Sequence, residues 1–251
     1  MEGLGAAVRF WPTALARTWG ALTLTAAVIG LSSAFGLWSP QSPWRLAAFA
    51  ASLAAVVMAQ GGLYRQALAV GAPGPAGLQW GMAENRLGAV WALTAVFLSV
   101  LGMLAFVVVL SFAFAIASAG KGFVTALPMT WARGVDDRGR AVMAIVAGLC
   151  LVGLTWSAMR VSLAAAATVA RGRLQVLASW PTTRGVVWPI VICKFALAIG
   201  PLGFAIGVLA WGARASSAPW LSGLVAGAMT VVWLPLNAGL MAYFYQRAAA
   251  T

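Results

Sequence analysis

The chain contains no histidine, and only four of its 251 residues are acidic. These are Glu2, Glu84, Asp136 and Asp137, and none of them lies inside a long apolar segment. General acid–base catalysis needs a titrating side chain in a protected site, and metal sites need clusters of histidine, cysteine or carboxylate ligands. The sequence offers neither, so we expect a non-enzymatic protein with no catalytic residue, no metal site and no cofactor.

Cysteine is nearly as scarce. The two cysteines, Cys150 and Cys193, both lie inside apolar segments, where a packing role is favoured over a disulfide or a metal pair. A serine or cysteine nucleophile would need a neighbouring base. Lys194 is the only candidate base that is expected to be buried, and no recognisable motif surrounds it.

Charged residues make up only 8% of the chain, whereas 63% of it is hydrophobic. Soluble domains average about 25% charged and about 45–50% apolar residues, and a soluble protein of this length could not bury so much apolar surface. Several windows of about 20 residues carry no charge, which is the length that crosses a hydrocarbon core about 30 Å thick. The composition therefore predicts an all-α, polytopic integral membrane protein.

Turn-forming residues divide the apolar sequence into six predicted transmembrane helices within a single transmembrane domain, residues 1–251. Pro40 and Pro43 end the first span, and the glycine- and proline-rich residues 71–77 follow the second. The expected spans are residues 18–38, 44–68, 87–117, 141–160, 186–211 and 220–245.

Three connecting segments are expected outside the membrane. Residues 78–86 are predicted to be a short polar connector, residues 121–140 an interfacial loop or short helix, and residues 213–219 a turn. A cleaved signal peptide is the alternative to a retained first span. We favour retention, because the apolar run extends past the small residues that would mark a cleavage site.

The ends of the predicted spans resemble one another, which indicates three repeated helical hairpins with short amphipathic interfacial helices. The second, fourth and sixth spans end at an arginine, and the other three begin with an arginine a few residues before a tryptophan. The alternative is chance, since both residue types are common at membrane boundaries. In either case equivalent positions are two spans apart, so six arginines are expected on one face: Arg17, Arg65, Arg86, Arg160, Arg184 and Arg247.

The orientation follows from the distribution of basic residues. With the N-terminus inside, the inner segments carry nine arginines: Arg9, Arg17, Arg65, Arg86, Arg160, Arg171, Arg173, Arg184 and Arg247. The outer segments carry six basic residues: Arg45, Lys121, Arg133, Arg138, Arg140 and Arg214. Because inner segments carry an excess of positive charge, we expect a multi-pass protein of a cell inner membrane with both termini in the cytoplasm.

Arginines beside the ends of apolar segments are most closely spaced in residues 160–188, where a basic amphipathic segment lies between two apolar helices. A net charge of +12 would suggest nucleic acid in a soluble chain. Here the basic residues flank apolar segments, which indicates anionic phospholipid headgroups or a membrane protein partner and no nucleic acid. The alternative role is a generic interfacial anchor. The candidate anion-binding residues are Arg65, Arg86, Arg160, Arg171, Arg173 and Arg184.

Among the polar residues within predicted spans, three are candidates for an intramembrane site: Lys194, Asn237 and Gln60. A lysine at the centre of a span costs about 2.5–3.5 kcal/mol on insertion, so Lys194 either snorkels to the headgroups or faces a polar cavity. Asn237 and Gln60 either form interhelical hydrogen bonds or line a path. If the three converge, the alternative function is a small transporter or channel subunit. The glycines of residues 200–203 and 223–227 predict close helix packing.

Four motifs carry a resemblance to a known family. They are Gly-Leu-Tyr-Arg at residues 62–65, Gly-Pro-Ala-Gly-Leu-Gln-Trp-Gly at 74–81, Arg-Val-Ser-Leu-Ala at 160–164 and Ser-Trp-Pro-Thr-Thr-Arg-Gly-Val-Val-Trp at 179–188. The chain resembles bacterial membrane proteins labelled as the membrane domain of glycerophosphoryl diester phosphodiesterase. The resemblance implies a six-helix inner-membrane domain. It does not imply hydrolase activity, because the catalytic domain of that enzyme uses histidines and acidic metal ligands. The chain departs from the family at residues 164–167, where a proline is expected.

Overall fold

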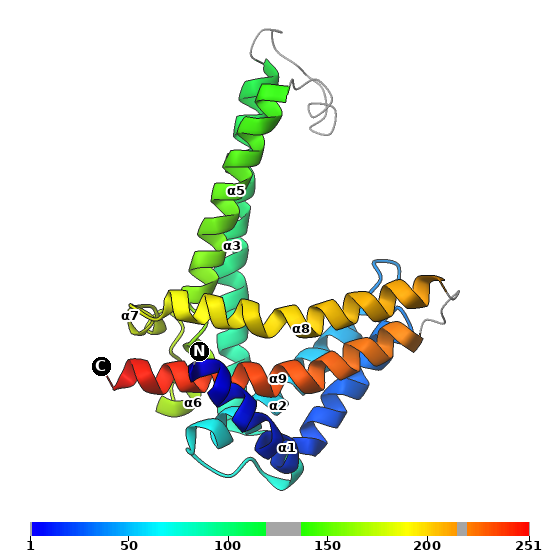
Figure 1. Ribbon diagram of the computed structural model, residues 1–251, viewed down its shortest axis with the longest axis vertical. Coiled ribbons are helices and arrows are strands. Elements are labelled where there is room, and N and C mark those ends of the chain that lie inside the picture. Colours follow the sequence, from blue (N-terminus) through cyan, green and yellow to red (C-terminus); the bar gives the residue numbers. More distant parts are fainter. Residues whose placement is uncertain (1, 119–136, 215–219, 251) are drawn as a thin grey trace. The chain divides into compact units, whose positions relative to one another are not determined.

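The computed structural model describes residues 2–118, 137–214 and 220–250 (Figure 1). Within these ranges every regular element is a helix, and six helices are long and apolar enough to cross a membrane. This confirms the predicted all-α polytopic fold. The elements are α1 (Glu2–Ala34), α2 (Arg45–Leu68), the 3-10 helix η1 (Pro75–Gly77), α3 (Met82–Ser118), α5 (Asp137–Arg160), α6 (Ala164–Arg171), α7 (Ser179–Thr182), α8 (Val187–Arg214) and α9 (Trp220–Ala249).

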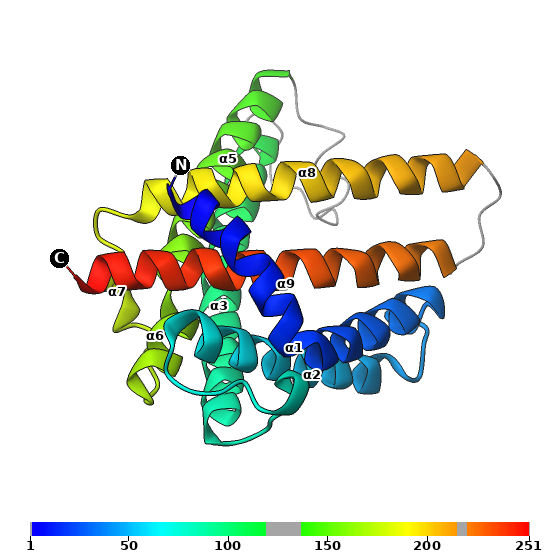
Figure 2. The same ribbon diagram turned by 60° about the horizontal axis from the view of Figure 1, so that its bottom comes forward.

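The chain divides into two compact units. The main unit comprises Met1–Trp91 and Val161–Thr251, and the hairpin unit is Ala92–Arg160. In the hairpin unit most of α3 runs beside α5 (Figures 1 and 2), and the Arg160 guanidinium lies 5.4 Å from the centre of the Trp156 ring. No residue in the most apolar window of either helix is buried. Such a surface is suited to lipid, because acyl chains are as apolar as leucine side chains.

The first helix of the main unit bends at Thr18, whose φ of −122° and ψ of 21° are not helical. The predicted start of the first span at residue 18 coincides with this bend, but residues 2–17 are helical as well. Thr18 Oγ1 donates to the Ala14 carbonyl at 2.7 Å. A Cβ on Gly77 would lie 2.9 Å from Thr18 Cα, so η1 packs directly on the bend. Gly77 has a φ of +79°, which glycine adopts without strain.

The closest helix packing in the main unit is between α1 and α9. A Cβ on Gly223 would lie 2.5 Å from the Gly30 carbonyl oxygen, and one on Gly227 would lie 3.0 Å from the Ala26 carbonyl oxygen. Backbones approach this closely only where side chains are missing. The packing role predicted for residues 223–227 is therefore confirmed.

The same prediction for residues 200–203 is wrong. A Cβ on Gly200 or Gly203 would meet no atom within 4 Å. Both glycines lie on α8, and α8 continues through Pro201. Their lack of a side chain brings no neighbouring helix closer among the described residues.

Two predicted connectors are partly helical. Residues 78–86 were expected to be a polar connector, but α3 already begins at Met82. The reason is a cap, because the Gly81 amide donates to Glu84 Oε2 at 2.9 Å and so satisfies an amide that the helix start leaves unpaired. Of the expected interfacial segment 121–140, Asp137 to Arg140 begin α5, and the remainder lies outside the described residues.

The remaining connectors are also described in part. Of the turn expected at 213–219, residues 213–214 end α8 and the rest lies outside the described ranges. The basic segment after Arg160 contains the predicted short helix, α6, which covers residues 164–167. The repeat aligns Leu78 and Gln79, before α3, with Leu174 and Gln175, before α8. The connector before α3 forms η1, and Gln79 is exposed there whereas Gln175 is buried. The two connectors that the repeat aligns therefore differ in conformation.

Candidate functional site

Exposed basic side chains gather at one end of the main unit. There α1 begins and α9 ends, and α6 and α7 lie in the segment that leads to α8 (Figure 2). We call this the junction end. The exposed arginines in its segments are Arg9, Arg171, Arg173, Arg184 and Arg247. The main unit has two carboxylate side chains, Glu2 and Glu84, and only Glu2 is exposed. The exposed surface of the junction end is therefore strongly positive.

The second carboxylate is neutralised inside the protein. Glu84 is 1% exposed and forms an ion pair with Arg65, which is 8% exposed. A Cβ on Gly61 would collide with Glu84 Oε1, so the glycine on α2 leaves room for the carboxylate of α3. Arg65 was expected to face headgroups, and it lies instead in the interior. Its Nε and Nη2 atoms find no acceptor among the described residues.

The other predicted anion-binding residues lie in different settings. Arg171 is exposed, and its Nη1 donates to Gln175 Oε1 at 3.2 Å. The backbone N–H of Gln175 in turn donates to Thr168 Oγ1 at 3.1 Å. Arg173 and Arg184 are exposed. Arg86 is half-buried, and its Nη1 lies 3.5 Å from the position of a Cβ on Gly172. The connector that carries Arg171 and Arg173 is thus held in place by internal hydrogen bonds.

None of the three intramembrane polar residues lines the cleft at the start of α8 or the apolar groove between α1 and α9. Gln60 is buried, and its Oε1 accepts a hydrogen bond from Trp91 Nε1 at 3.1 Å. An interhelical hydrogen bond is one of the two roles that the sequence predicted for Gln60. Lys194 on α8 and Asn237 on α9 are half-buried.

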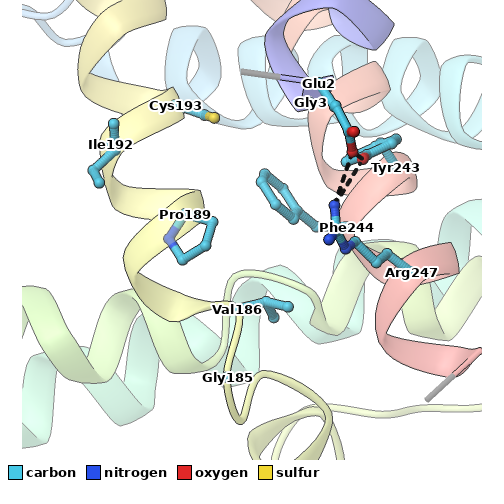
Figure 3. Close-up of a pocket in the computed structure, with 10 residues that line it drawn as sticks. All are labelled: Glu2, Gly3, Gly185, Val186, Pro189, Ile192, Cys193, Tyr243, Phe244 and Arg247. Atoms are coloured by element: carbon cyan, nitrogen blue, oxygen red, sulfur yellow. Dashed lines mark hydrogen bonds and ion pairs between the residues drawn. The ribbon is translucent and has the colours of Figure 1, made fainter.

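A cleft of about 520 Å³ opens at the junction end, between the start of α8, the end of α9 and the first residues of α1 (Figure 3). One side carries polar groups. Tyr243 Oη donates to Glu2 Oε2 at 2.8 Å, Arg247 Nη1 donates to the same oxygen at 3.0 Å, and Arg247 Nη1 also donates to Tyr243 Oη at 3.1 Å. The apolar lining comes from α8, the residue before it, and α9: Val186, Pro189, Ile192, Cys193 and Phe244.

A second cavity, of about 610 Å³, is an apolar groove beside the α1–α9 crossing. Its lining includes Gly30, Gly223 and Gly227, together with Leu31 and Trp220. It contains no charged side chain, and its position between two apolar helices suits contact with acyl chains.

Neither the buried ion pair nor the polar group of the cleft was found from the sequence. Glu84 gave a local signal, because it stands three residues after Gly81 at the start of a helix, which is the position of a capping carboxylate. Glu2 and Arg247 are 245 residues apart, and no local pattern connects them. Both cysteines are free thiols, with Cys193 buried beside the cleft.

The structure thus defines an all-α protein with six helices suited to crossing a membrane and a polar, basic end. Comparison of the chain with models of protein families, with curated proteins and with solved structures found no match.

Proposed function

We propose that this protein is a non-enzymatic, multi-pass membrane protein that binds anionic phospholipid through the junction end. The observation that carries the proposal is the imbalance of charge: five arginines are exposed there and one carboxylate, Glu2, is exposed with them. Glu2 is itself bonded to Arg247. The binding residues are Arg171, Arg173 and Arg184, with Arg86 partly accessible beside them.

The chemistry of arginine supports this assignment. A guanidinium presents paired N–H donors that match the oxygens of a phosphate. Each basic residue near an anionic leaflet contributes about 1 kcal/mol of binding free energy. The bonds from Arg171 to Gln175 and from Gln175 to Thr168 order the connector before lipid arrives, so less conformational entropy is lost on binding.

The location that we propose is a cell inner membrane with both termini in the cytoplasm, because inner segments carry the excess of basic residues and the inner leaflet is the anionic one. The resemblance to bacterial membrane domains labelled as those of glycerophosphoryl diester phosphodiesterase leads to the same proposal. It adds no hydrolase activity. A protein partner that presents acidic side chains is the competing ligand for the same arginines, and the experiment below separates the two.

Replacing Arg171, Arg173 and Arg184 together with glutamine is expected to weaken binding of phosphatidylglycerol by about 100-fold, because about 1 kcal/mol is lost for each of the three charges. The measurement is native mass spectrometry of the purified full chain titrated with that lipid.

The matched control is R45Q/R138Q/R140Q, which removes the same charge from exposed arginines outside the junction end. It is expected to bind phosphatidylglycerol like the unsubstituted chain. Equal affinity of the two triple variants for this lipid would overturn the proposal and would favour a protein partner as the ligand of the arginines.

A further inference from the structure

The cleft at the junction end carries both signs of charge side by side. The Glu2 side chain is 77% exposed and the Arg247 side chain 58% exposed, so both groups are open to a ligand. They are joined at 3.0 Å through a single nitrogen and a single oxygen, Nη1 of Arg247 and Oε2 of Glu2. This arrangement differs from the rest of the junction end, where the exposed charges are all positive.

The pair leaves hydrogen-bonding capacity of both kinds. Both bonds that the carboxylate accepts go to Oε2 of Glu2, which leaves Oε1 as an acceptor. Both bonds that the guanidinium donates come from Nη1 of Arg247, which leaves Nε and Nη2 as donors. A ligand that fits must therefore present an anion to Arg247 and a hydrogen-bond-donating cation to Glu2.

The rest of the cleft is apolar and extends along the first turns of α8. In Figure 3 the Pro189 ring and the Cys193 sulfur of α8 face the Phe244 ring of α9. Residues 186–193 cover about 10 Å along the helix, at about 1.5 Å per residue. Phe244 and Cys193 are each 4% exposed, so this wall is fixed by packing. Its length suits the first carbons of an acyl chain below a headgroup at the helix ends.

We propose that this cleft is a binding site for a zwitterionic aminophospholipid, with phosphatidylethanolamine as the ligand. Its phosphate accepts hydrogen bonds from Arg247 Nε and Nη2, and its primary ammonium donates to Glu2 Oε1. The first part of one acyl chain lies against Val186, Pro189 and Phe244. This site is separate from the arginines of the connectors, which bind anionic lipid.

The pairing of the Glu2 carboxylate with the Arg247 guanidinium also predicts which lipids are disfavoured. Phosphatidylcholine carries the same charges, but its quaternary ammonium has no N–H with which to bond Glu2. Phosphatidylglycerol has no cation, so its phosphate would meet the Glu2 carboxylate unpaired. An unpaired charge or an unsatisfied acceptor is what discriminates between otherwise similar ligands.

The test is native mass spectrometry of the full chain with equal concentrations of dioleoyl phosphatidylethanolamine, phosphatidylcholine and phosphatidylglycerol. The background is R171Q/R173Q/R184Q, so that failure of the anionic site and failure of this site give separate results. We expect the ethanolamine lipid to bind about tenfold more tightly than the choline lipid, which corresponds to about 1.4 kcal/mol. Glu2→Gln is expected to abolish this ratio, and Arg247→Gln to weaken both lipids.

The matched control is Asp137→Asn, which removes the carboxylate of a second exposed carboxylate–arginine pair, Asp137 with Arg140, outside the cleft. It is expected to keep the tenfold ratio. Because the lipids compete in one sample, a partly unfolded variant loses all of them together and does not imitate a loss of selectivity. The proposal is overturned if the unsubstituted cleft binds the ethanolamine and choline lipids equally, or if Glu2→Gln leaves their ratio unchanged.

Discussion

Replacing Glu84 with alanine is expected to lower the free energy of unfolding by about 3–5 kcal/mol, because it leaves the Arg65 guanidinium buried without a counter-charge. Two of the three nitrogens of Arg65 already lack an acceptor among the described residues, so no other partner replaces the carboxylate. The substitution also removes the cap on the Gly81 amide. Equilibrium unfolding in mixed micelles, followed by tryptophan fluorescence, measures the change.

Two further variants test whether the pair itself is responsible. Asp137→Ala breaks an exposed pair with Arg140 and is expected to cost less than about 1 kcal/mol. R65M/E84M removes both charges and is expected to be more stable than Glu84→Ala, since a buried ion pair is often replaceable by apolar side chains. A Glu84→Ala cost no larger than that of Asp137→Ala would show that Arg65 is not confined to the interior.

Replacing Gly223 with alanine is expected to lower the free energy of unfolding by about 1–3 kcal/mol through overpacking. The added Cβ would lie 2.5 Å from the Gly30 carbonyl oxygen and 2.8 Å from Ala34 Cβ. The first contact is with backbone, which cannot move aside by changing a rotamer, so α1 and α9 must separate. The same unfolding experiment measures the cost.

The control is Gly207→Ala on α8, where an added Cβ meets nothing within 4 Å. That change is expected to be neutral or to stabilise by about 0.5–1 kcal/mol, because alanine loses less conformational entropy in a helix than glycine does. If Gly223→Ala and Gly207→Ala unfolded alike, the close α1–α9 crossing would be contradicted.

The long helices were predictable because membrane burial requires long uncharged segments, and prolines and glycines mark where they stop. The predicted second span, residues 44–68, matches α2, and the predicted start at 220 matches α9. The helical residues 2–17 were missed, because their polar and aromatic side chains give no long apolar run, and α1 continues through its bend at Thr18.

The site was less predictable, because it depends on contacts between distant residues. Arg65 and Arg184 have similar positions beside apolar helices in the sequence. Arg65 is buried in an ion pair with Glu84, whereas Arg184 is exposed. Only the fold brings α3 against α2 and decides this. For the same reason Gly200 and Gly223 look alike in sequence, and only the second faces another helix.

Both proposals depend on one claim, that the connectors of the junction end and both termini of the chain lie on the same side of the membrane. Single cysteines at positions 17, 173 and 247, introduced into a C150S/C193S background, test it when labelled with a membrane-impermeant maleimide. All three are predicted to react only from the cytoplasmic side, and a cysteine at position 45 only from the opposite side. Labelling of position 173 from the side on which position 45 reacts would contradict the account.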